Sequence, residues 1–214
     1  MARRRWVPAA LLTLGAIPVV IGSIRLVELV GGPEMIPTDL RFAASPVPVV
    51  IHVVTAIGYV LLGAFQFAPG IRRKHRGWHR RAGRVLVVLG LAAALSAIWM
   101  TLFFPFKEGT GVLLFGFRLL AGMGMAYGLV MGIRFARQRQ IRRHRAWMSR
   151  AYALGLGAGT QAFTVGFGEA LFGSGVVRTD LMMGLAWALN LAVAEWFIRR
   201  PVVARSRAPV ARVA

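Results

Sequence analysis

The chain has 214 residues, of which 57% are hydrophobic, and it carries a formal net charge of +20 at pH 7. This apolar fraction exceeds that of ordinary soluble domains, and the apolar residues form long runs, so the composition indicates a membrane protein. The absence of cysteine excludes disulfides, thiolate metal sites and haem attached covalently through cysteine.

Six apolar runs predict six transmembrane helices in a single membrane domain that covers residues 1–214, because about 20 apolar residues cross a bilayer. The first run could be read as a signal peptide. It is longer than the apolar core of a signal peptide, and no small-residue cleavage site follows it, so we expect a retained helix. The fold class is therefore all-α, a polytopic bundle of six transmembrane helices. The predicted helices cover about 7–30, 47–67, 85–104, 112–133, 151–172 and 181–198, and a basic tail covers 199–214.

Basic residues alternate between crowded and sparse segments along the chain. Three precede the first run, seven lie in each of the segments 71–84 and 134–150, and five lie in the tail. The other three loops hold one each, namely Arg41, Lys107 and Arg178. Because basic loops stay in the cytoplasm, both termini are predicted to be cytoplasmic.

The partner expected from this charge is the lipid bilayer, with anionic headgroups as the counter-charge. No recognition motif for nucleic acid accompanies the basic residues, so we expect no nucleic-acid partner. The near exclusive use of Arg, with Lys only at Lys74 and Lys107, is typical of a GC-rich bacterial genome. We therefore expect a multi-pass protein of a bacterial plasma membrane. The sequence leaves open whether the protein forms a homo-oligomer.

Ionisable residues inside the predicted helices are candidate functional groups, because charge is costly in a bilayer. The predicted topology places several of them within about 10 Å of the outer surface. We therefore predict a polar pocket that opens outward. Alternatively, Arg25 and Arg118 reach the headgroups and Glu169 neutralises one of them. The pocket candidates are His52, Thr55, Tyr59, Arg118 and Glu169.

Other polar and small residues predict contacts between helices. Asn190 and Gln161 are expected to form interhelical hydrogen bonds, and Glu195 to pair with arginines of the basic loops. Small residues four apart let helices approach closely, so we expect the fourth and fifth helices to pack tightly. These residues are Gly124, Gly128 and Gly132 in the fourth helix, and Ala151, Gly155 and Gly159 in the fifth.

Both Arg-rich segments contain a His-Arg motif just before an apolar run. HRRAGR covers His79 to Arg84, and HRAWMSRAYAL covers His144 to Leu154. The parallel indicates a weak internal duplication of helical hairpins. The motif candidates are His79, Arg80, Arg84, His144, Arg145, Trp147, Met148 and Arg150.

These motifs, together with His52, LLGAFQF at Leu61 to Phe67 and NLAVAEW at Asn190 to Trp196, carry a family resemblance. The chain resembles uncharacterised bacterial multi-pass membrane proteins, labelled "predicted membrane protein" and classed as a domain of unknown function. The resemblance covers residues 45–198. It implies a multi-helix membrane protein and supports a special role for His52, His79 and His144. It implies no reaction, because none is settled for the family.

Three functions stay open at this stage. The first is to bind or move a small, anionic solute through the outward pocket, with Arg118 attracting the charge and His52 exchanging a proton. The second is a redox component that carries b-type haem or meets a quinone, with His79, His144 and His52 as haem ligands. The third is a membrane scaffold or assembly factor whose basic face binds lipid or an acidic protein.

The sequence favours no enzyme class. It contains no G-x-S-x-G motif, no H-E-x-x-H motif and no phosphate-binding loop with its lysine. A metal site built from the loop histidines would need a carboxylate or another third ligand, and the two basic loops contain no carboxylate.

Overall fold

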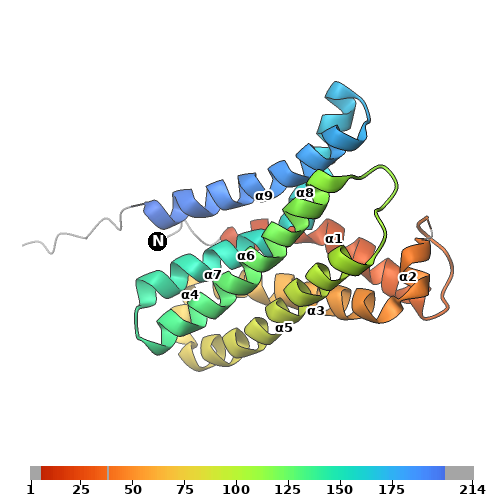
Figure 1. The fold of residues 1–214 in the computed structure, drawn as a ribbon. Helices are drawn as coiled ribbons and strands as arrows, with labels where there is room; N and C mark the ends of the chain where they lie inside the picture. Colours follow the sequence, from red (N-terminus) through yellow and green to blue (C-terminus); the bar gives the residue numbers. More distant parts are fainter. Residues whose placement is uncertain (1–5, 38, 201–214) are drawn as a thin grey trace, which may run out of the picture.

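The computed structural model describes residues 6–37 and 39–200, and within these residues all regular structure is helical (Figure 1). Five helices are long and apolar enough to cross a membrane, which confirms the prediction of an all-α membrane protein. Most of the predicted basic tail, from residue 201 onward, lies outside the described residues. The five long helices are α1 (Val7–Leu29), α3 (Pro46–Gln66), α5 (Arg76–Phe103), α6 (Val112–Arg137) and α9 (Val176–Arg199).

The predicted fifth helix is built from two shorter helices. α7 (Ile141–Gly155) has 15 residues and α8 (Gly157–Phe172) has 16, and they meet at Leu156. Each is shorter than the roughly 20 residues that a membrane crossing needs, so neither could span a bilayer alone. Two further short helices, α2 (Leu40–Ala44) and α4 (Pro69–Lys74), lie in segments that the sequence analysis treated as loops.

The helices next to the basic segments start earlier than their apolar runs. α5 begins at Arg76 rather than near residue 85, and α7 begins at Ile141 rather than near residue 151, so residues 138–140 alone connect α6 to α7. Hydropathy marks only the part of a helix that meets hydrocarbon, whereas arginine is itself a good helix former and continues the helix into the headgroup region. Proline marks two helix starts, because Pro8 lies in the first turn of α1 and Pro46 in that of α3.

Helices that follow one another in the sequence also pack on one another. α1 packs on α3, α3 on α5, α5 on α6, α6 on α7, and both α7 and α8 on α9, while α1 also contacts α8. The connections therefore gather at two ends of the bundle (Figure 1). We call the end with residues 30–37, 39–45, 104–111 and 173–175 the α2 end, and the end with residues 67–75 and 138–140 the basic end.

The core lies where α3, α5, α6 and α7 meet. Tyr59 and Tyr152 are buried there, with ring centroids 5.5 Å apart. Many large apolar side chains elsewhere are exposed, for example Val88 at 67% and Leu120 at 66%, as expected for helices whose outer faces meet lipid.

The predicted close packing of the fourth and fifth helices is present between α6 and α7. A Cβ atom added at Gly128 would lie 3.2 Å from the Cβ of Ala151, and one at Gly124 would lie 3.2 Å from Leu154. The other two small residues of the fifth helix meet different partners. Gly155 faces the ring of Tyr59, and Gly159 packs against the backbone of α1.

Candidate functional site

A small pocket opens at the α2 end, between α2, the last turn of α5, the α5–α6 loop and the first turns of α6. Its volume is ≈ 20 Å³, which is room for about one water-sized group. Its walls combine aromatic and aliphatic side chains with four polar residues, and we call it the Arg118 pocket. The polar residues are Arg41, Thr101, Thr110 and Arg118.

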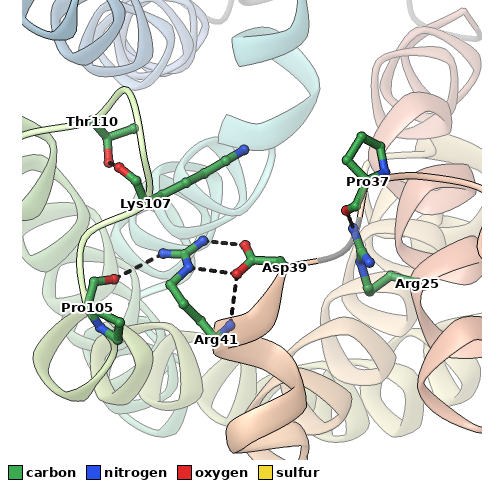
Figure 2. Close-up of polar contacts among 7 residues, drawn as sticks. All are labelled: Arg25, Pro37, Asp39, Arg41, Pro105, Lys107 and Thr110. Atoms are coloured by element: carbon green, nitrogen blue, oxygen red, sulfur yellow. Dashed lines mark hydrogen bonds and ion pairs between the residues drawn. The ribbon is translucent and has the colours of Figure 1, made fainter.

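Arg41 joins α2 to the α5–α6 loop. Its Nε and Nη2 donate to the carboxylate of Asp39 at 2.8 and 2.5 Å, and its Nη1 donates to the Pro105 carbonyl at 3.2 Å (Figure 2). Asp39 also accepts the backbone N–H of Arg41 at the start of α2. The hydrogen bonds and positive charge of Arg41 hold the pKa of Asp39 below its usual value.

A second ion pair fixes the segment between α1 and α2. Arg25 Nη1 donates to Glu28 Oε2 at 2.7 Å. Arg25 Nη2 donates to the Pro37 carbonyl at 2.8 Å (Figure 2). Glu28 Oε1 accepts the backbone N–H groups of Met35 and Ile36. The neutralising partner of Arg25 is therefore Glu28, three residues along the same helix, rather than Glu169.

Asp180 caps the N-terminus of α6, although it lies on α9. It lies on α9 with 1% of its surface exposed, and its carboxylate accepts the N–H groups of Gly111 at 3.0 Å and Leu114 at 3.1 Å. It therefore satisfies backbone donors that begin a helix and have no partner within it. The sequence analysis placed Asp180 in a turn and did not select it, although it is one of only seven acidic residues in the chain.

Arg118 lines the same pocket, one helical turn beyond Leu114. Among the described residues it has no hydrogen-bond or ion-pair partner, although it lies in electrostatic range of both Arg41 and Asp180. Arg41 and Asp180 already have their own partners. Arg118 is therefore a partly buried cation that lines the pocket and whose five N–H donors have no acceptor among the described residues.

The other pocket candidates lie elsewhere. His52 faces α5, where its Nδ1 donates to the Ala93 carbonyl at 2.9 Å. The Thr55 hydroxyl donates to the Ile51 carbonyl of its own helix, Tyr59 is in the core, and Glu169 is exposed on α8. Of the five candidates, Arg118 alone is among the residues that line this pocket.

At the basic end, the second His-Arg motif fastens α7 to its neighbours. His144 Nδ1 donates to the Gly132 carbonyl of α6 at 2.8 Å, and the Met148 side chain lies against Gly132. Arg150 forms the predicted ion pair with Glu195 of α9 at 2.5 Å and also lies over the Trp147 ring. This part of the motif therefore holds helices together.

The remaining motif residues are not drawn into one cluster. Arg80, Arg84 and Arg145 are exposed, and His79 is partly buried near the start of α5.

The three candidate histidines do not form a joint metal or haem site. The Nδ1–H groups of His52 and His144 each donate to a backbone carbonyl, which is also the orientation of many metal-binding histidines. His52 lies toward the α2 end, however, whereas His79 and His144 lie at the basic end. The described residues contain no group of three or more His, Asp or Glu side chains placed to hold a metal ion.

The junction of α7 and α8 is held by polar side chains of α9. Asn190 Nδ2 donates to the Ala153 carbonyl at 3.1 Å, and Trp187 Nε1 donates to the Leu154 carbonyl at 3.2 Å. In an unbroken helix these carbonyls would accept the N–H groups of residues 157 and 158. The interhelical hydrogen bonds predicted for Asn190 and Gln161 are both present, with Thr160 donating to Asn190 and Gln161 donating to the Met183 carbonyl.

Comparison with known proteins identifies a family without assigning a reaction. The family described as "Predicted membrane protein (DUF2306)" matches residues 49–198, a segment that contains both His-Arg motifs and every helix from α4 to α8. No curated protein and no solved structure matched the chain. The match covers more than half of the sequence, and the protein therefore belongs to this family of predicted membrane proteins.

Proposed function

We propose that this membrane protein binds a small anionic group, a carboxylate or a phosphate, in the Arg118 pocket on the outer side of a bacterial plasma membrane. The observation that supports this proposal is Arg118, which lines the pocket and has no hydrogen-bond or ion-pair partner in residues 6–37 and 39–200. A buried cation is stable when an acceptor or a counter-charge completes it. A bound anion would supply both.

The chemistry of the pocket suits an anion with two oxygens. The guanidinium presents N–H donors in a planar fork that matches a carboxylate or a phosphate, and such charge-assisted hydrogen bonds are stronger than neutral ones. Arg41 adds a second positive group, although Asp39 shares its charge. Because the pocket volume is ≈ 20 Å³, only one or two oxygens of the anion would enter it, and the rest of the anion would stay outside.

Binding of inorganic phosphate and acetate tests the proposal. The protein would be placed in phosphatidylcholine nanodiscs, and its thermal unfolding compared in each salt and in chloride at equal ionic strength. A bound anion stabilises the folded state by RT ln(1 + [L]/Kd), so we expect at least one of the two to raise Tm by about 3–6 °C at a tenfold excess over Kd. Arg118→Gln should abolish the rise.

Arg178→Gln is the matched control, because Arg178 is an exposed arginine at the same end of the bundle and outside the pocket lining. It should retain the response to the anion. If neither anion stabilises the wild-type protein beyond chloride, or if Arg178→Gln loses the response equally, the pocket does not bind a small anion.

The proposed topology has six crossings with both termini in the cytoplasm, and α7 and α8 together form the fifth. The distribution of the basic residues supports this orientation. The chain has no cysteine, so single cysteines give unambiguous labels. Glu108→Cys should react with an impermeant maleimide in intact cells, whereas Gln138→Cys should react only after permeabilisation. The reverse pattern would refute the orientation.

A further inference from the structure

One face of α6 is largely exposed among the described helices, with one ring contact to α7, where the ring centroids of Tyr127 and Trp147 are 5.3 Å apart. Its glycines face α7, and Met125 and Leu129 are buried in the core. The remaining face carries a stripe of exposed apolar side chains at helical spacing. The stripe consists of Leu120 at 66%, Met123 at 51%, Tyr127 at 56% and Val130 at 52% exposure.

This stripe ends in a groove at the basic end of α6. The groove is shallow and open, and its lining residues all lie on α6 or directly after it. They are Val130, Ile133, Arg134, Arg137 and Gln138, so that apolar side chains come first and cationic ones follow. Arg134 and Arg137 are exposed, and within the described part of the chain neither has a hydrogen-bond or ion-pair partner.

We propose that the groove binds one anionic phospholipid, with its phosphate between Arg134 and Arg137 and one acyl chain along the stripe. The dimensions agree with a lipid in one leaflet. The part of the stripe from Met123 onward matches, because Met123 lies eleven residues before Arg134, which is about 16 Å along a helix, and one leaflet of hydrocarbon is about 15 Å thick. Leu120 lies one turn farther from the arginines. The apolar stripe therefore ends, and the arginines begin, at the depth of the headgroups.

Charge determines which lipid the groove prefers. The guanidinium groups of Arg134 and Arg137 can form bidentate hydrogen bonds with one phosphate. Phosphatidylcholine carries its own cation beside the phosphate, whereas phosphatidylglycerol is a net anion. The groove should therefore select phosphatidylglycerol, and each arginine should contribute about fivefold to the preference. The selection does not depend on which leaflet faces the cytoplasm or on the Arg118 pocket.

Native mass spectrometry tests the inference. The protein would be equilibrated in nanodiscs that contain equal amounts of phosphatidylglycerol and phosphatidylcholine, and the lipids retained after release would be counted. The wild-type protein should retain one phosphatidylglycerol molecule preferentially. Arg134→Gln/Arg137→Gln should lower this preference at least tenfold, whereas Arg118→Gln should leave it unchanged.

Arg142→Gln/Arg145→Gln is the matched control, because it removes the same charge from two exposed arginines at the same end but outside the groove. It should keep the preference. An equal loss in this control would show that diffuse surface charge attracts the lipid, and equal retention of both lipids would also overturn the inference. Displacement of the lipid by millimolar inorganic phosphate would show an anion site without a lipid-specific component.

Discussion

Asn190 Nδ2 lies 3.1 Å from the carbonyl oxygen of Ala153, at the point where the backbone ladder of α7 ends. Its own Oδ1 accepts the Thr160 hydroxyl at 2.8 Å, so a single side chain of α9 bridges the two halves of the broken helix. We expect Asn190→Ala to destabilise the protein by about 1–2 kcal/mol, because interhelical hydrogen bonds in membranes contribute about 0.6 kcal/mol each and at most about 1.7.

Unfolding in mixed micelles with increasing dodecyl sulfate would measure this loss. Leu189→Ala is a suitable control, because Leu189 is the preceding residue of the same helix and is 45% exposed. A control variant as unstable as Asn190→Ala would show that the bridge contributes little.

A side chain at Gly128 should separate α6 from α7. The Cβ position is 3.2 Å from Ala151 Cβ and 3.5 Å from the Trp147 carbonyl, so a leucine cannot be accommodated without moving a helix. Gly128→Leu should cost about 1–3 kcal/mol of unfolding free energy. Gly116→Leu on the same helix should be almost neutral, since no atom of a neighbouring helix lies within 4 Å of its Cβ position. Thermal unfolding of both variants would check the difference.

Removing the carboxylate of Asp180 should leave the first turn of α6 without acceptors. Asp180→Ala leaves the N–H groups of Gly111 and Leu114 without their acceptor, so we expect the free energy of unfolding to fall by about 1–3 kcal/mol. Asp180→Asn keeps one acceptor oxygen and should lose less. The exposed Glu169→Gln should have no measurable effect, and chemical denaturation of the three variants would test this order.

The Asp39–Arg41 pair should make stability depend on acidity. The pKa of Asp39 is lower in the folded protein than in the unfolded chain, so its contribution is present above the unfolded pKa and is lost as pH falls through the folded pKa. Between about pH 6 and 3, wild-type Tm should therefore fall more than that of Asp39→Asn. The contribution of the Asp39–Arg41 pair to the free energy of unfolding should stay below about 1 kcal/mol, because the pair is near the surface. Parallel Tm curves for the two proteins would contradict this interpretation.

The apolar runs were sufficient to predict an all-helical membrane protein and the approximate place of its long helices. They could not reveal the break at Leu156, because LGLGAG reads as a continuous apolar segment. The break depends on Trp187 and Asn190, which lie more than thirty residues away in sequence. Hydropathy reports how well a segment suits contact with lipid. It does not report whether a side chain of another helix can replace a backbone N–H as the donor to a carbonyl.

The same limit applied to the Arg118 pocket. Costly charge within an apolar run was enough to select Arg118, but the sequence could not show which residues surround it. His52 was selected for the same reason, and its place between α3 and α5 depends on the Ala93 carbonyl of the neighbouring helix. Asp180 was overlooked because a carboxylate near a predicted turn resembles any solvated loop residue, and only the fold brings it to Gly111.

The two-part crossing also has a consequence for biogenesis. In the proposed topology, α7 and α8 leave the ribosome before α9, and neither is long enough to be inserted as an independent segment. The carbonyls of Ala153 and Leu154 at their junction gain these hydrogen-bond donors only when α9, with Trp187 and Asn190, packs against them. A helix that is synthesised later thus completes the crossing before it, and the order of synthesis becomes part of how the protein reaches its native state.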